Sequence, residues 1–149
     1  MAIMLGLGTL VGTAGTALAS TVGPVPAFDP VPFSPAGCAI QYMANAHISY
    51  DNKNGVPEAA KANAKTTCKG KVELLTLQVV LTDVTTGESK RTEVDDQNAS
   101  YLFNQETFLP CHGNTEHIYV GHALGTSTED GKVYMQERDG QPTPVECSR

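Results

Sequence analysis

The stretch K-V-E-L-L-T-L-Q-V-V-L-T-D-V, residues 71–84, decides the fold. From residue 75 to residue 81 every second residue is a large aliphatic, with Glu73 and Asp83 at the two ends of this row, and the row between mixes aliphatic residues with threonine and glutamine. The aliphatic row consists of Leu75, Leu77, Val79 and Leu81. Because successive side chains of a strand point to opposite faces, this alternation predicts a strand with one buried and one half-buried face. Such a strand needs other strands to cover it.

The remaining sequence predicts further short strands separated by turns. Strands are expected at residues 39–50, 89–95, 99–103, 116–125 and 133–135, with a loop at 95–98 and a proline-containing tail at 140–149. Residues 56–68 are ambiguous, because Pro57 and four alanines favour a helix whereas their alternation with polar residues favours a strand. We prefer the strand, since small inward-facing residues let a second sheet approach. The expected fold is an all-β, immunoglobulin-like β-sandwich with two disulfides.

The chain divides into three parts. Residues 1–19 carry no charge, are apolar and end in Ala17-Leu18-Ala19, which predicts a signal peptide cleaved before Ser20. A transmembrane anchor is the alternative, but the apolar run is short and no basic flank follows it. Residues 20–37 form a proline-rich extended segment, and residues 38–149 form the folded domain. The expected localisation is secreted.

The charge of the chain argues against two classes of partner. The net charge is −6, and the lysines and arginines do not form a cluster. Such a chain has little electrostatic attraction for nucleic acid or for an anionic lipid surface. We therefore expect neither nucleic acid nor, after signal cleavage, a membrane as partner.

Four cysteines, an even number in a small exported chain, predict two disulfides. They are Cys38, Cys68, Cys111 and Cys147. Three pairings are possible. Pairing Cys68 with Cys111 and Cys38 with Cys147 is preferred because the second bridge would tie the ends of the domain together. Pairing of sequence neighbours is the alternative.

The proline-rich segment is the best indication of function. Five prolines within residues 20–37 exclude a helix and favour an extended conformation. A plain spacer would be polar, yet this segment carries large apolar side chains at five positions. These positions are Val22, Val25, Phe28, Val31 and Phe33. An extended, stiff and apolar segment can bind a groove of another protein at low entropic cost, so we expect these residues to bind a partner.

Neither a metal site nor a catalytic set is expected. His117 and His122 are five residues apart and therefore point to opposite faces of a strand, while Cys111 is expected in a disulfide. The sequence lacks the known nucleophile, zinc-protease and phosphate-loop motifs. Chance groupings remain, such as Ser127 with His122 and Asp130, or the carboxylates of Glu93, Asp95 and Asp96. We expect no cofactor. We expect the aromatic residues on the strand rows mostly to pack in the core; these are Tyr42, Tyr50, Tyr101, Phe103, Tyr119 and Tyr134.

Several landmarks resemble a family of small exported actinobacterial β-sandwich proteins with two disulfides. They include A-H-I-S at 46–49, A-K-T-T-C ending at Cys68, the aliphatic strand, P-C at 110–111 and the final Cys147. The architecture is also similar to the adaptor subunit of the umbrella toxin particles of Streptomyces-like bacteria. That resemblance implies a small adaptor that joins a lectin-like subunit to a large repeat-containing toxin protein, and it implies no catalytic residue.

The expected function is therefore a secreted, non-catalytic binding or adaptor module that joins other secreted proteins through its N-terminal segment. An inhibitor of a secreted hydrolase, acting through an exposed loop such as residues 112–116, is the alternative. A small secreted hydrolase is a third possibility.

Overall fold

The computed structural model describes residues 31–43, 45–50 and 53–147, and every regular element in these ranges is a strand. The strands are β1 (Ala39–Met43), β2 (His47–Tyr50), β3 (Pro57–Asp83), β4 (Ser89–Pro110), β5 (Glu116–Glu129), β6 (Lys132–Asp139) and β7 (Thr143–Glu146). No helix that could cross a membrane occurs in the described ranges. The predicted signal peptide lies outside them. The chain is thus all-β, as expected.

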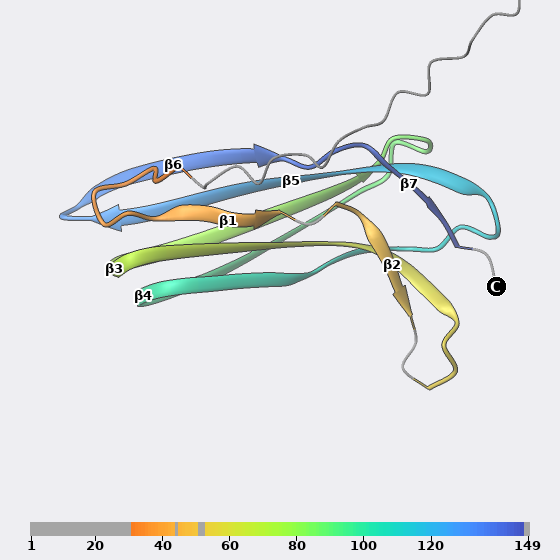
Figure 1. The fold of residues 1–149 in the computed structure, drawn as a ribbon, viewed down its shortest axis with the longest axis horizontal. Coiled ribbons are helices and arrows are strands. Elements are labelled where there is room, and N and C mark those ends of the chain that lie inside the picture. The colour runs from red at the N-terminus through yellow and green to blue at the C-terminus, as the bar shows by residue number, and fades with distance from the viewer. Residues whose placement is uncertain (1–30, 44, 51–52, 148–149) are drawn as a thin grey trace, which may run out of the picture.

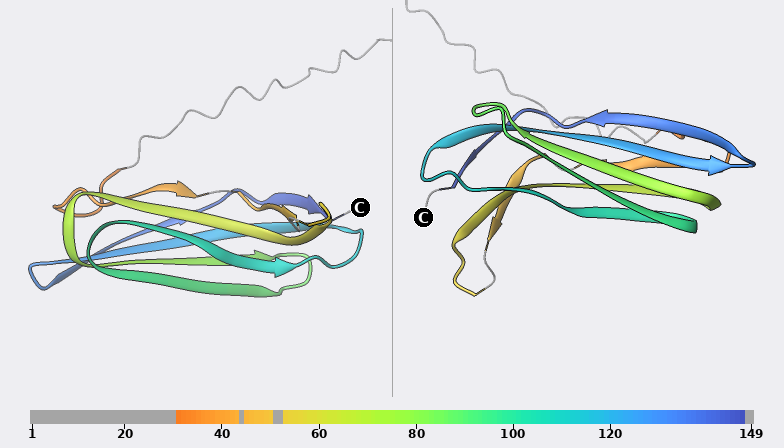
Figure 2. Two further views of the ribbon diagram at one scale, coloured as in Figure 1. Left: turned by 90° about the horizontal axis from the view of Figure 1, so that it is seen from below. Right: turned by 180° about the vertical axis from the view of Figure 1, so that it is seen from behind.

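β3 organises the sheet, and it does so in two halves. Its first half pairs with β1, β2 and the second half of β4, while its second half pairs with β5 and the first half of β4. β5 in turn pairs with β6 and β7. The register of β3 and β4 shifts between Thr67 and Val72, where both strands bend (Figure 1). The antiparallel sheet therefore curls over itself into two layers that are joined at the bend (Figure 2).

The core lies between the two layers. The predicted aliphatic row of β3 is fully buried, and so is a row of small residues on the first half of the same strand. These small residues are Ala60, Ala62, Ala64 and Thr66. Gly125 of β5 approaches this row closely: a Cβ placed on it would lie 3.3 Å from Thr66 Oγ1 and 3.2 Å from Ile40 Cγ1. Asn104 also links the layers, because its Nδ2 donates to the carbonyl of Leu77 at 3.2 Å. The strand predicted at 56–68 is confirmed, and the helical alternative is wrong.

The structure corrects three of the predicted element boundaries. The strand expected at 39–50 is divided into β1 and β2, and the expected tail contains β7. Residues 95–98, expected to be a loop, belong to β4 and pair with β3. The polar residues of this stretch are compatible with a strand because β4 is the edge of its layer, where side chains are solvated.

Aromatic residues on the second half of β4 face solvent instead of the core. Tyr101 is 52% exposed and Phe103 is 37% exposed, whereas Leu102, which lies between them, and Asn104, which follows Phe103, are buried. Ala99, which shares their parity, is buried as well. The register of β4 with β3 is irregular between Ala99 and Tyr101, next to Asn98 with its φ of 50°, so the parity of Ala99 does not continue to Tyr101 and Phe103. The prediction that these aromatic side chains pack in the core is wrong.

Both disulfides are present, but with the pairing of sequence neighbours. Cys38 is bonded to Cys68, and Cys111 to Cys147. The preferred pairing of Cys68 with Cys111 and Cys38 with Cys147 is wrong. The reason is the strand register: Ala39 of β1 lies opposite Thr67 of β3, which places the preceding and following cysteines side by side. The first bridge thus lies at the bend, and the second holds the end of β7.

Candidate functional site

The N-terminal segment joins the fold through residues 31–37, which we call the root. The root is a turn: Phe33 N donates to the carbonyl of Cys38 at 2.7 Å, and Gly37 N donates to that of Ser34 at 2.9 Å. Gly37 has a φ of 68°, a conformation that favours glycine. Lys69 N donates to the carbonyl of Ala36 at 2.9 Å, which joins the root to the bend of β3. The predicted segment therefore ends in an ordered connection.

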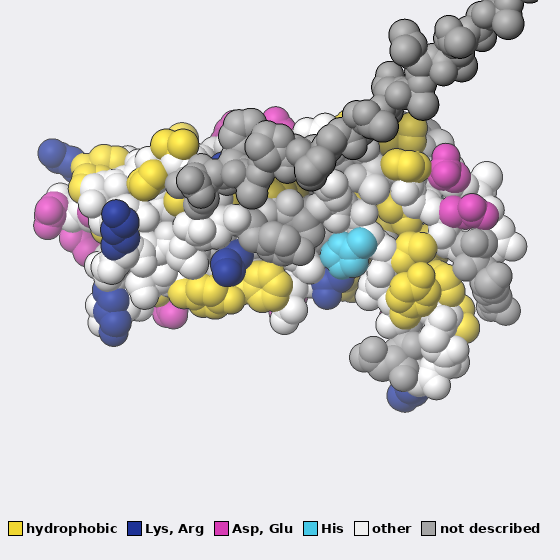
Figure 3. Space-filling model, viewed as in Figure 1, with side chains coloured by type: hydrophobic (Ala, Val, Ile, Leu, Met, Phe, Trp, Pro, Cys, Tyr) yellow, Lys and Arg dark blue, Asp and Glu magenta, His cyan; other side chains and the backbone are white. Residues whose placement is uncertain are grey.

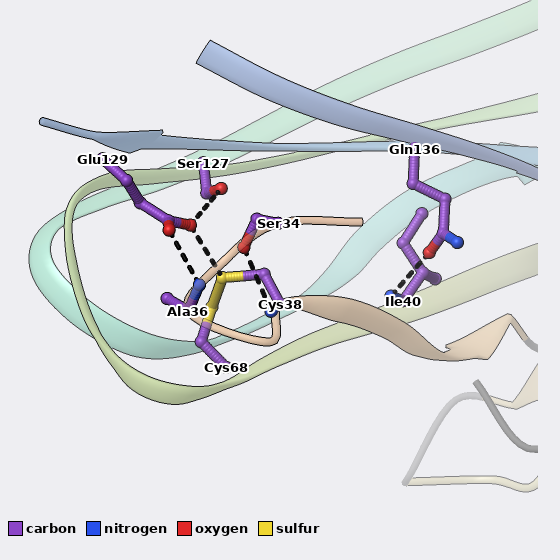
Figure 4. Close-up of a disulfide and its surroundings, with 8 residues drawn as sticks. All are labelled: Ser34, Ala36, Cys38, Ile40, Cys68, Ser127, Glu129 and Gln136. Atoms are coloured by element: carbon purple, nitrogen blue, oxygen red, sulfur yellow. Dashed lines mark hydrogen bonds between the residues drawn. A yellow bond between two sulfur atoms is a disulfide. The ribbon is translucent and has the colours of Figure 1, made fainter. Parts of the chain in front are cut away.

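Glu129, at the end of β5, holds the root from the opposite layer (Figure 4). Its Oε2 accepts a hydrogen bond from Ala36 N at 2.8 Å, and its Oε1 accepts one from Ser127 Oγ at 2.9 Å. Burial opposes ionisation of this carboxyl, but hydrogen bonds from Ser34, Ala36 and Ser127 outweigh it and lower the pKa of Glu129. The charged carboxylate is therefore the form that holds the root.

Gln136 of β6 holds the root at its first described residue. Its Nε2 donates to the carbonyl of Val31 at 3.0 Å, and its Oε1 accepts a hydrogen bond from Ile40 N at 3.0 Å. The side chain thus bridges the root and β1, and Figure 4 shows it on the same side of the fold as Glu129. Two polar side chains, one from β5 and one from β6, therefore fix the root on the folded domain.

The five predicted partner-binding residues fall into three groups. Val22, Val25 and Phe28 lie outside the described residues. Val31 is 67% exposed, so its side chain is available to a partner. Phe33 is partly buried and packs against the core. Phe33 therefore contributes to the packing of the root.

Exposed apolar side chains also occur on β4 and β6, where the sequence analysis placed no site. On β4 they are Tyr101, Phe103 and Phe108, and on β6 they are Val133 and Met135. Figure 3 shows hydrophobic side chains over β2 and over the region where β3 and β4 run side by side. An open groove of about 600 Å³ lies between the two halves of β4. It is lined by Lys61, Lys90, Thr92, Gln105, Glu106 and Phe108. Alternation alone does not predict the exposed aromatic row of β4, because the register with β3 shifts both between Ala99 and Tyr101 and between Asn104 and Thr107.

The three histidines of the second half of the chain contact three different carboxylates. His112 Nε2 lies 2.8 Å from Glu88, and His122 Nδ1 lies 2.7 Å from Asp139. His117 Nδ1 lies 2.6 Å from the buried Asp83. In the part of the chain that the structure describes, no group of three or more potential metal ligands converges. These contacts connect strands and loops and do not build a common site.

Asp83 has a structural role at the turn between β3 and β4. Its Oδ1 accepts hydrogen bonds from the backbone of Thr85 at 2.8 Å and of Thr86 at 3.2 Å. Burial raises the pKa of this carboxyl, but the hydrogen bonds from His117, Thr86 and Thr85 outweigh burial and lower it. The His117 ring stacks on His112 and on Tyr119, with centroids 5.9 and 6.3 Å apart. The cluster fixes the β3–β4 turn against β5.

The chance groupings of possible catalytic residues have separate partners. Ser127 Oγ donates to Glu129, whereas His122 contacts Asp139, so the two residues do not form a nucleophile and base pair. Glu93 accepts a hydrogen bond from Gln78 at 3.0 Å on the outer face of the sheet. These contacts account for the residues as parts of the fold.

No protein-family model, curated protein or solved structure matches the chain. The function is therefore inferred from the geometry described above.

Proposed function

We propose that the chain is a secreted, non-catalytic binding module that joins other secreted proteins through residues 20–31. The observation that carries the proposal is the anchored root. Glu129 and Gln136 fix the last residues of an apolar, proline-rich segment, and Val31 at its end is exposed. A stiff segment that leaves a rigid domain at a fixed point loses little entropy when it binds.

The two disulfides are consistent with an extracellular protein, because such bonds persist in oxidising compartments. The resemblance to the adaptor of umbrella toxin particles suggests partners for the segment: a large repeat-containing toxin and a lectin-like subunit. We also keep the immunoglobulin-like class as part of the proposal. Two facing antiparallel layers support it, and an experimental determination of the strand order would test it.

The test replaces the apolar side chains of the segment without touching the root. The variant Val22→Ser/Val25→Ser/Phe28→Ser keeps residues 31–37, since removing them would also remove the contacts of Glu129. The tagged protein is purified from the culture supernatant of the producing bacterium, and the proteins that accompany it are identified by mass spectrometry. We expect a partner with the wild type and none with the variant.

A matched control removes exposed apolar side chains elsewhere. Val133→Ser/Met135→Ser changes two side chains of β6 that are 63% and 62% exposed. This control should retain the partner. Loss of the partner in the control, together with its retention in the segment variant, would contradict the proposal and assign binding to β6.

Inhibition of a secreted hydrolase is the second candidate. It is favoured by the loop at residues 112–115, which follows the disulfide between Cys111 and Cys147 and carries exposed side chains. His112 in this loop also contacts Glu88, so the loop is held on both sides. A stiff exposed loop binds at low entropic cost. Inhibition of purified proteases or lysozyme-type enzymes that is lost in Asn114→Ala would favour this function.

A further inference from the structure

The first half of β4 is a regular edge of the sheet. β4 pairs with β3 alone among the described strands, so the other side of its backbone has no strand partner there. Residues 89–97 pair with residues 74–82 of β3 without a register shift, and they contain no proline. An edge of this kind offers a row of backbone donors and acceptors to another strand.

The charges along this edge are arranged with opposite signs at its two ends. Lys90 and Arg91 stand at the beginning, and Asp95 and Asp96 stand at the end. All four side chains are exposed. Arg91 lies 3.5 Å from Glu93, and the other three have no ion pair among the described residues. The edge is therefore basic at one end and acidic at the other.

This arrangement fits a second copy of the same edge. When two identical strands pair antiparallel about a two-fold axis, the beginning of each lies opposite the end of the other. With the axis at Glu93, Lys90 lies opposite Asp96 of the second copy and Arg91 lies opposite its Asp95. Each of these pairs occurs twice. Opposite charges that face each other across strands stabilise the pairing.

We propose that the protein forms a homodimer in which the first halves of two β4 strands pair antiparallel at residues 89–97. The sheet then runs without interruption from β6 of one copy to β6 of the other. Glu93 meets its own counterpart at the axis. Its carboxylate already accepts a hydrogen bond from Gln78 at 3.0 Å and lies 3.5 Å from Arg91, contacts that reduce the repulsion.

Charges on edge strands often prevent pairing, but here the pattern of signs has the opposite effect. An edge with charges of one sign repels its own copy, whereas an edge with opposite signs at its ends attracts it in the antiparallel orientation. The second half of β4 lacks these features. Its pairing with β3 is irregular between Ala62 and Ala64, and it carries the single exposed charge of Glu106. The contact is therefore confined to the first half.

Two charge-reversal variants test the dimer. Lys90→Glu/Arg91→Glu makes the edge acidic throughout, and Asp95→Lys/Asp96→Lys makes it basic apart from Glu93. Sedimentation velocity of the purified protein over a concentration series should show a dimer for the wild type. Each variant alone should dissociate at least about tenfold more readily, because its cross-strand pairs become repulsive. A mixture of the two variants should form a heterodimer, since each edge now complements the other.

A control variant carries the same change of charge as Lys90→Glu/Arg91→Glu, but away from the edge. Lys71→Glu/Lys132→Glu alters two exposed lysines outside β4 and should dimerise like the wild type. Circular dichroism establishes that each variant is folded. The wild-type dimer should also weaken as salt is added, a measurement that requires no variant.

Three results would overturn the inference. They are a wild type that stays monomeric at every concentration, a folded charge-reversal variant that dimerises like the wild type, and a mixture of the variants that stays monomeric. A wild-type dimer that is insensitive to salt would equally contradict a contact made by these charges.

Discussion

Replacing Glu129 by glutamine should loosen the root and destabilise the domain. The carboxylate accepts hydrogen bonds from Ala36 N at 2.8 Å and Ser127 Oγ at 2.9 Å, and the lowered pKa of Glu129 reflects a third from Ser34. A hydrogen bond to a charged group contributes about 1 kcal/mol more than a neutral one, so three bonds give about 3 kcal/mol. Because the side chain is only half-buried, we expect a loss of about 2 kcal/mol.

The loss should depend on pH in a defined direction. The pKa of Glu129 in the folded protein lies below the value of 4.5 that an unperturbed glutamate has. A lowered pKa stabilises the folded state above pH 4.5 and ceases to do so as the pH falls through the folded value. Urea unfolding of the wild type and of Glu129→Gln, with both disulfides intact, should therefore differ at neutral pH and converge in acid.

The neighbouring Asp130→Asn is the matched control, because it removes the same charge one residue away. Asp130 is exposed and has a φ of 50°, a conformation that asparagine tolerates equally well. We expect this variant to stay within about 0.5 kcal/mol of the wild type. Equal stability of Glu129→Gln and Asp130→Asn at neutral pH would refute the role assigned to Glu129.

Three further predictions concern the rest of the fold. Asp83→Asn should lower the free energy of unfolding, measured with urea at neutral pH, by about 1–3 kcal/mol, because a buried charge that accepts several hydrogen bonds is lost. The pKa of Asp83 in the folded protein lies below its ordinary value of 3.8, so the difference between wild type and variant should disappear as the pH falls through the folded value. Gly125→Ala should lower the free energy of unfolding by about 1–3 kcal/mol, because the added Cβ would lie 3.2 Å from Ile40 Cγ1; since Ile40→Ala removes Cγ1, the double variant Gly125→Ala/Ile40→Ala should lose less than the sum of the two single losses, and additive losses would contradict the contact. Replacing Cys111 and Cys147 by alanine should lower the free energy of unfolding by about 3–4 kcal/mol, from a loop of 36 residues, while an unchanged urea midpoint would contradict this estimate.

The sequence predicts the strands of this fold better than their arrangement. The alternation at Leu75, Leu77 and Leu81 is a local property, and it predicts both the strand and its buried face correctly. Local alternation predicts the alanine row of residues 60–64 for the same reason. What local alternation cannot predict is that both stretches belong to one bent strand. The irregular register at the bend separates the buried Ala99 from Tyr101 and Phe103, which share its parity but are exposed.

The disulfide pairing and the root depend on the same long-range geometry. Cys38 meets Cys68 because β1 runs beside the first half of β3, a register that no short motif specifies. Glu129 contacts Ala36 across 93 positions of the chain. The apolar side chains of the N-terminal segment could be identified from the sequence, but the residues that anchor it could not. The predicted boundary between residues 37 and 38 therefore falls between the root and the folded domain, although the root is hydrogen-bonded to that domain.

Hydrogen–deuterium exchange of the protein, alone and with the partner recovered from the supernatant, tests the binding function most directly. If the segment is the contact element, the backbone amides of residues 20–31 should gain protection in the complex, while the two sheet layers stay unchanged. Protection that appears at residues 112–115 or along β4, with residues 20–31 unaffected, would contradict the account.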